Sequence, residues 1–241
     1  CFELGKRLNP KACPWETVSE FFTEQIKEKT GLTYPELKDK VVQQQKYVYR
    51  KYEKGMLRSD GEPGFETLTG LIELKATIFE SWGEDPLPYF KEPPFSPYST
   101  PDLYAEYPLV LTTGGRKFTS FHSEHRQIPS LRQITPWPTV EIHPDTASEL
   151  GIMDGDWVCI ENHLGKCRMK ALVQPTVHPK VVHALHGWWY PEQDGAEPNL
   201  FGTFKSNINM LMPHKKVGNL GLGANYKSNL CKVYKVSGLD D

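Results

Sequence analysis

The chain is organised around residues 109–126, which read LVLTTGGRKFTSFHSEHR. The apolar residues at 109–111 predict a buried strand, and Gly114 and Gly115 predict a turn at its end. The loop that follows is dense in hydrogen-bond donors, namely Arg116, Lys117, His122, Ser123, His125 and Arg126. Because glycine lets backbone N–H groups come close to a ligand, and because arginine and hydroxyl groups bind anions, we expect this loop to bind a phosphate or a nucleotide.

The composition is that of an ordinary globular protein of 241 residues, which is enough for one large or two small domains. The formal net charge of -2 provides no general attraction to nucleic acid or to a membrane surface. No apolar run approaches the roughly 20 residues that cross a bilayer. We therefore expect no nucleic-acid partner and no direct membrane insertion. The chain begins at Cys1 and shows no signal peptide, so we expect that the natural N-terminus is missing, and the localisation stays open between periplasm and cytoplasm.

The five cysteines do not form a recognisable metal or disulfide pattern. Their number is odd and no two of them stand in a CxxC pair, which argues against a zinc site and against a run of iron–sulfur ligands. Cys159 and Cys167 flank a predicted hairpin, and we expect them to be buried free thiols rather than a disulfide. The spacing of His178, His183 and His186 does not by itself indicate a metal site. No catalytic residue and no metal ligand is predicted in this chain.

The first 106 residues divide into a helical part, 1–60, and an irregular part, 61–106. Apolar spacing predicts a helix over 15–29 that ends at Gly31, and Pro35 suits the first turn of a second helix over 34–49. One strand is predicted at 71–74. The prolines of 85–101 exclude helix and central strand, so this stretch is interpreted as an extended connector.

From residue 107 onward the pattern changes to short strands and turns. Strands are predicted at 109–113, 139–143, 156–161, 166–173, 181–186 and 230–236, with a short helix over 143–151 and a long loop over 190–229. Many short strands with one short helix indicate a closed β-barrel with mixed connections.

These motifs together resemble the molybdopterin oxidoreductases of the dimethyl sulfoxide reductase family. The block PTVEIHPDTASELGIMDGDWV at 138–158 is similar to the family's pattern nearly in full, and TTGGR at 112–116 followed by His122-Ser123 is similar to its Thr-Gly-Arg and His-Ser runs. Asn209-Met210-Leu211, Tyr226-Lys227 and GFETLTGLIEL at 64–74 also resemble family segments. One departure is an extra glycine, TTGGR in place of TGR.

The resemblance implies a mainly β fold with helices, in which a double-psi β-barrel over 107–241 follows a helical remnant at 1–60 and a connector at 61–106. It implies that the barrel binds molybdopterin guanine dinucleotide, carrying molybdenum or tungsten. The expected contacts are Thr113, Gly114, Gly115, Arg116, His122, Ser123, Arg126, Asn209, Tyr226 and Lys227.

The resemblance also implies what lies elsewhere. A 4Fe-4S cluster and the metal-ligating residue are expected only in a missing upstream region, so we expect this chain to be a C-terminal fragment that is inactive alone. Its expected partners are the remaining domains of the same subunit and an iron–sulfur electron-transfer subunit, and the chemistry is either redox or hydration. The alternative is a stand-alone double-psi barrel that serves protein interaction or recognition, which would not need Gly-Gly-Arg followed by His-Ser.

Overall fold

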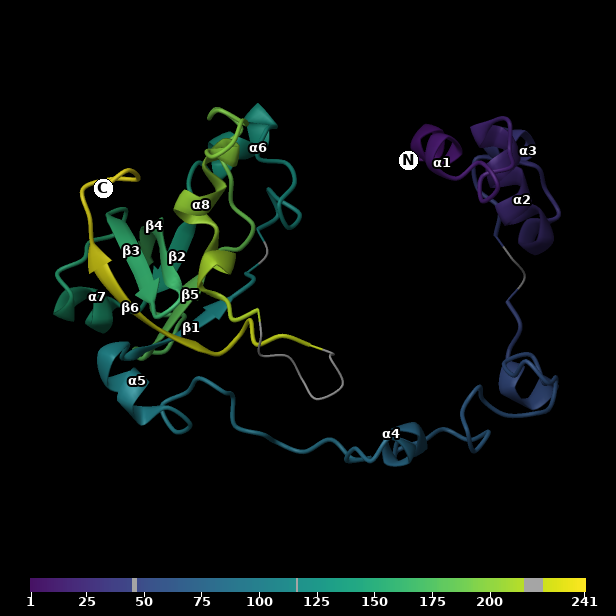
Figure 1. Cartoon of the computed structure of the whole chain (residues 1–241), viewed down its shortest axis with the longest axis horizontal. Coiled ribbons are helices and arrows are strands. Elements are labelled where there is room, and N and C mark those ends of the chain that lie inside the picture. Colours follow the sequence, from purple (N-terminus) through teal and green to yellow (C-terminus); the bar gives the residue numbers. More distant parts are fainter. Residues whose placement is uncertain (45–46, 116, 215–222) are drawn as a thin grey trace. The chain divides into compact units, whose positions relative to one another are not determined.

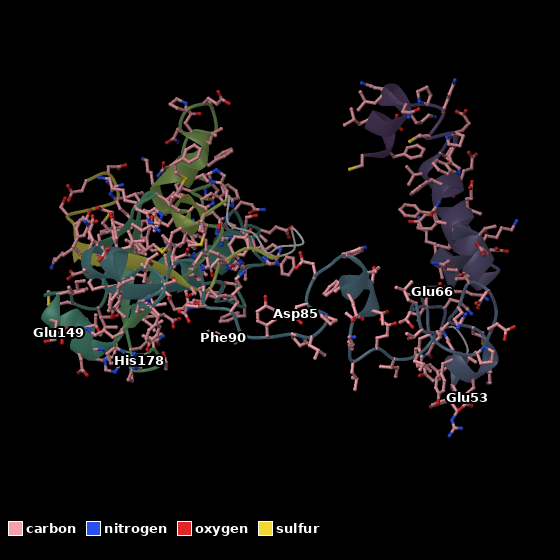
Figure 2. All side chains as sticks on the ribbon, turned by 60° about the horizontal axis from the view of Figure 1, so that its bottom comes forward. Glu53, Glu66, Asp85, Phe90, Glu149 and His178 are labelled. Carbon is pink, nitrogen blue, oxygen red and sulfur yellow. The ribbon has the colours of Figure 1, made fainter. Side chains whose placement is uncertain are left out.

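The computed structural model describes residues 1–44, 47–115, 117–214 and 223–241. It divides into two compact units, Cys1–Tyr89 and Phe90–Asp241, which are described separately. The division lies inside the segment interpreted as a connector. Figure 2 shows the backbone between Asp85 and Phe90 as an extended segment, whereas the side chains of the second unit are crowded together. Within the described ranges no helix is long and apolar enough to cross a membrane.

The first unit contains short helices, as the sequence predicted. Thr17 and Glu20 form a capping box that begins α2 (Val18–Thr30), and Gly31 ends it in a left-handed conformation with φ 72°. The ring of Phe22 stacks on that of Tyr34 at 5.1 Å, which joins α2 to the next helix. The helical elements of this unit are α1 (Phe2–Leu8), α2, α3 (Tyr34–Lys40), η1 (Lys51–Lys54) and α4 (Thr77–Ser81).

Two predictions for this unit were wrong. The helix expected over 34–49 ends at Lys40, because Val41 takes φ 64° and the apolar side chains beyond it, such as Val42, stay exposed and give no packing that would extend a helix. The strand expected at 71–74 does not form. The Glu73 carboxylate there accepts hydrogen bonds from the hydroxyls of Thr69 and Thr77, which holds the segment in turns without a strand partner.

The second unit is a closed six-stranded barrel, in agreement with the predicted fold class (Figure 1). Its strands follow the order β1-β5-β2-β4-β3-β6 around the barrel. The β1–β5 and β2–β4 pairs are parallel and the other four pairs are antiparallel. The strands are β1 (Leu109–Thr113), β2 (Thr139–Ile142), β3 (Trp157–Asn162), β4 (Gly165–Val173), β5 (Val181–Ala184) and β6 (Asn229–Lys235).

The barrel core consists of inward-facing aliphatic side chains from all six strands. In β1 burial alternates strictly, and Leu111 is fully buried, as are Val140, Ile160 and Val182 on other strands. Cys159 and Cys167 are buried and free, as predicted, and Cys231 is buried and free as well. Burial raises the pKa of the Cys167 and Cys231 thiols.

The connections of the second unit hold more helix than the sequence indicated. The predicted short helix is present as α7 (Pro144–Glu149), and Gly151 just beyond it has φ 64°. The prediction of a continuous loop over 190–229 was wrong, because three short helical elements occupy part of it. The elements not predicted are α5 (Pro101–Glu106), α6 (Pro129–Ile134), η2 (Leu200–Gly202), α8 (Thr203–Ser206) and η3 (Ile208–Leu211).

Candidate functional site

The strand register gathers three predicted segments at one end of the barrel. Thr113, the last residue of β1, pairs with Ala184, the last residue of the parallel strand β5. Leu111 pairs with Asn229, the first residue of the antiparallel strand β6. The exits of β1 and β5 and the entry to β6 therefore lie together, as expected where loops present a ligand site on a barrel.

Thr113 and Lys227 are in direct contact at this end. The Thr113 hydroxyl donates a hydrogen bond to the Tyr226 carbonyl oxygen at 2.8 Å, and the Lys227 ammonium group donates one to the Thr113 carbonyl oxygen. We call residues 113–115 with Tyr226, Lys227 and His183 the β1 corner. Five of the residues that the sequence assigned to cofactor binding thus converge here.

At each of the two glycines of the β1 corner, the end of another residue's side chain lies where a Cβ atom would be. A Cβ on Gly114 would lie 2.6 Å from Lys227 Nζ, and this residue has φ 96°, which other residues rarely adopt. A Cβ on Gly115 would lie 2.4 Å from His183 Nε2. The absence of a Cβ at both positions therefore lets the lysine and the histidine lie against this turn, while the Gly114 N–H donates to the Ala184 carbonyl oxygen at 3.4 Å.

His183 is a member of this site that the sequence did not single out, because only the parallel β1–β5 register brings it to Gly115. Its ring is half-buried, and burial lowers its pKa. Lys227 and Lys117 lower the pKa further, while Glu141 raises it. Lys117 Nζ lies 3.8 Å from a Glu141 carboxylate oxygen. The imidazole is thus held neutral beside two ammonium groups, which makes the site attractive to anions.

The predicted residues His122 and Ser123 belong to a second group, formed with the segment that leaves β5. His122 Nδ1 lies 3.2 Å from His186 Nε2, and Trp189 Nε1 donates to the Ser123 carbonyl oxygen at 2.5 Å. His122 has φ 49°, a conformation uncommon outside glycine and typical of constrained functional loops. These contacts fix the loop 119–126 against the residues after β5.

Arg126, which the sequence analysis placed among the expected cofactor contacts, is buried. Its guanidinium donates to the carbonyl oxygens of Glu124 and His186 at 3.1 Å each and lies 4.9 Å from the Trp188 ring centroid. Burial lowers its pKa to about 10, and the charge of Arg132 contributes to that shift. Its hydrogen bonds and ring contact thus join it to Glu124, His186 and Trp188, and none of them is with the described residues of the β1 corner.

Two further residues predicted to contact the cofactor, Arg116 and Asn209, are in neither of these groups as described. Arg116 lies outside the described residues, as does most of the glycine-rich stretch 218–223. Asn209 is exposed on η3, which packs against the β3–β4 turn, since Asn162 Nδ2 donates to the Leu211 carbonyl oxygen at 2.9 Å. Among the described side chains, no group of three His, Cys, Asp or Glu residues is placed to bind a metal ion.

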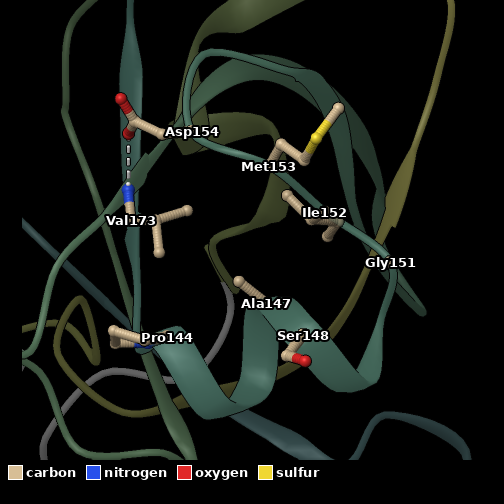
Figure 3. Close-up of a pocket in the computed structure, with 8 residues that line it drawn as sticks. All are labelled: Pro144, Ala147, Ser148, Gly151, Ile152, Met153, Asp154 and Val173. Atoms are coloured by element: carbon tan, nitrogen blue, oxygen red, sulfur yellow. Dashed lines mark hydrogen bonds between the residues drawn. The ribbon is translucent and has the colours of Figure 1, made fainter.

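A separate hollow of about 670 Å³ lies beside α7 and contains none of the predicted residues (Figure 3). In it the Val173 N–H donates to the Asp154 carboxylate at 2.8 Å, which ties the end of β4 to the loop after α7. Its lining combines small and apolar residues with one already paired carboxylate, so it offers little for anion binding.

Comparison with known proteins gives one family match. Residues 109–230 match the model of the family described as "Molydopterin dinucleotide binding domain". The matched range begins at β1 and ends in β6, and it therefore includes both groups of predicted residues.

Individual relatives extend the similarity beyond the barrel. Dopamine dehydroxylase of Eggerthella lenta is 37% identical over an alignment of 210 residues that covers 78% of this chain and 20% of that protein. Acetylene hydratase of Syntrophotalea acetylenica is 31% identical over an alignment of 243 residues that covers 97% of this chain and 32% of that protein. A solved structure of acetylene hydratase from Pelobacter acetylenicus matches 97% of this chain and 32% of its own with a TM-score of 0.80 and 28% identity. The chain thus spans a third or less of the length of these relatives.

Proposed function

The chain belongs to the molybdopterin dinucleotide-binding family, and we propose that its barrel binds the guanine dinucleotide end of the molybdopterin cofactor at the β1 corner. The proposal rests on one observation: Lys227 lies where a Cβ of Gly114 would be, and His183 lies where a Cβ of Gly115 would be. A pyrophosphate group needs close access to the backbone and compensating positive charge; the glycines allow the first and Lys227 supplies the second.

The residues of the chain fit such a group in distinct ways. Lys227 supplies a compact positive charge, while Thr113 holds the Tyr226 carbonyl and so fixes the approach to β6. We propose that the loop of His122 and Ser123 contributes polar contacts next to the phosphates. Arg116 and Asn209 are proposed as contacts on the resemblance alone, and Arg126 is considered below. The domain limits 107–241 are likewise a proposal.

For the whole protein we propose a molybdopterin-dependent oxidoreductase, of which this chain is the C-terminal part. When bound, the cofactor supplies a molybdenum or tungsten centre that performs the redox or hydration step. The chain's own residues bind and orient the nucleotide end. We propose that the chain has no turnover by itself, and that a 4Fe-4S cluster, the metal ligand and contacts to an iron–sulfur subunit belong to other parts of the enzyme.

The rival function, a barrel for protein recognition, lacks a comparable observation. A recognition surface has no need for two glycines that admit a lysine and a histidine to the same backbone turn. The comparisons with a dehydroxylase and a hydratase, both enzymes by name, also favour the cofactor proposal.

Isothermal titration of the chain with GDP tests the proposal. Lys227→Met removes a charge-assisted hydrogen bond and is expected to weaken GDP binding about tenfold or more, since such bonds contribute roughly 1.5–3 kcal/mol. Lys166→Met, which removes an exposed lysine on β4, is the matched control and is expected to leave the affinity unchanged. Absence of GDP binding at millimolar concentration, or equal effects of the two variants, would count against the proposal.

A further inference from the structure

Two arginine guanidiniums contact the ring of one buried tryptophan, Trp188. The Cζ atoms of Arg126 and Arg132 each lie 4.9 Å from a Trp188 ring centroid. Arg126 comes from the loop after β1, Arg132 from α6, and Trp188 from the segment after β5. Trp188 is 1% exposed and Arg126 is 3% exposed, so this cluster is a built part of the interior.

Each of the three side chains has a buried N–H group without an acceptor among the described residues. The groups are Arg126 Nε, Arg132 Nη1 and Trp188 Nε1. Folded proteins pair nearly all of their buried donors with protein, water or a ligand. Three unpaired donors on side chains that share one ring indicate a common acceptor.

The charges of the cluster do not balance. Arg132 Nη2 pairs with a Glu192 carboxylate oxygen at 3.0 Å. Arg126 donates only to carbonyl oxygens, and within the described ranges it has no carboxylate at ion-pair distance. The Glu124 carboxylate is directed elsewhere, since it lies 3.8 Å from His125 Nε2. The pKa of Arg126, lowered to about 10 by burial, still leaves it protonated at neutral pH, so one positive charge is uncompensated.

We propose that Arg126, Arg132 and Trp188 bind the carboxylate group of a small molecule. A carboxylate carries the single negative charge that the cluster lacks, and its two oxygens accept several hydrogen bonds from planar guanidinium donors. A phosphate dianion would exceed the available charge.

Arg132 also lies near the ring of Trp137, which lines a groove. Arg132 Cζ is 5.9 Å from the Trp137 ring, and Trp137 lines a groove of about 580 Å³ together with Phe118 and Ile134. The side chain of Arg132 is 18% exposed and that of its ion-pair partner Glu192 is 55% exposed, whereas Arg126 and Trp188 are 3% and 1% exposed. We therefore expect the carboxylate to enter at Arg132, with the rest of the molecule toward Trp137.

This site is separate from the β1 corner. The side-chain hydrogen bonds of Arg126 and Arg132 are with Glu124, His186 and Glu192, and none of these bonds is with Thr113 or Lys227. The carboxylate proposal therefore stands or fails independently of dinucleotide binding, and it gives Arg126 a ligand other than the cofactor.

NMR detection of the unpaired N–H groups tests the proposal directly. In the 241-residue chain, the Arg126 Nε–H and Trp188 Nε1–H signals are expected to shift together and to saturate when acetate is added at constant ionic strength, with chloride as the control salt. Arg132→Gln is expected to weaken acetate binding about tenfold. Arg168→Gln is the matched control, because Arg168 Nε is also buried and unpaired but is not among the arginines in contact with Trp188; it should leave the affinity unchanged.

A second variant keeps the proposal falsifiable if Arg132→Gln does not fold. Glu192→Gln removes the one exposed carboxylate of the cluster and is expected to tighten acetate binding. Signals that do not shift, or that shift equally with chloride, would show that water alone pairs these donors and would overturn the proposal. A saturable response to inorganic phosphate but not to acetate would contradict the monoanion, and unchanged affinity in Glu192→Gln would contradict the charge argument.

Discussion

The hydroxyl of Thr113 donates a 2.8 Å hydrogen bond to the carbonyl oxygen of Tyr226, a residue 113 positions later in the chain. The ammonium group of Lys227 in turn donates a hydrogen bond to the carbonyl oxygen of Thr113. These contacts join the end of β1 to the entry of β6, so the proposed phosphate site exists only when the barrel is closed.

Replacing Thr113 with valine removes this hydrogen bond while keeping the side-chain shape. Thr113 is 4% exposed, so its loss leaves the Tyr226 carbonyl without this donor. The free energy of unfolding in urea is expected to fall by about 1 kcal/mol. Thr112→Val changes the neighbouring residue, whose side chain points to the other face of the strand, and is expected to cost less than about 0.5 kcal/mol. Equal losses would show that the Thr113 contact has no particular role.

The variant Gly115→Ala tests the close approach of His183 to the backbone. The new Cβ would lie 2.4 Å from His183 Nε2, so the ring must move, and GDP binding is expected to weaken about tenfold while overpacking costs roughly 1–3 kcal/mol of stability. Gly165→Ala is the control, because its nearest neighbour would be 3.5 Å away. Calorimetric titration of both variants with GDP measures the difference. Unaltered GDP binding in Gly115→Ala would contradict the claim that the site needs glycine at this position.

Local sequence signals explain which parts of this structure could be predicted. The helix beginning at Pro144 and the β3–β4 hairpin follow from capping residues, glycine stops and apolar alternation, all of which act within a few residues. The strand expected at 71–74 shows the limit of such patterns, because an apolar run without a partner strand does not form a sheet.

The site was predictable to the same extent. Gly114 and Gly115 can be recognised in the sequence as a turn directly after an apolar strand. His183 becomes a neighbour of Gly115 only through the parallel pairing of β1 with β5. Arg126 reads as a loop arginine in the sequence, and its burial against Trp188 depends on residues 60 or more positions away. Such long-range register is not encoded by spacing within one segment.

The pH dependence of stability should reflect His183. Burial lowers its pKa below the ordinary value of 6.5 in the folded protein. Below about pH 6.5 the unfolded chain takes up a proton that the folded chain does not, so stability falls as the pH decreases through this range. Urea unfolding at about pH 7 and pH 5 is expected to show a smaller loss in His183→Gln than in the original chain. The exposed His214→Gln serves as control, and parallel losses in all three proteins would contradict this assignment.

The barrel core should dominate the stability of the second unit. Leu111 is fully buried among core side chains, so Leu111→Ala is expected to lower the free energy of unfolding by about 2–5 kcal/mol. Leu164→Ala, at a turn residue that is 42% exposed, should cost less than about 0.5 kcal/mol. Chemical denaturation followed by tryptophan fluorescence measures both. A small effect of Leu111→Ala would mean that this barrel is not the cooperative unit.

Backbone amide NMR of the 241-residue chain during titration with GDP tests the central claim most directly. Dinucleotide binding at the β1 corner predicts saturable shifts in residues 112–115, 122–123 and 226–227, with loss of these shifts in Lys227→Met. The claim would be contradicted if these amides did not move at millimolar GDP, or if the shifts were confined to the hollow beside α7.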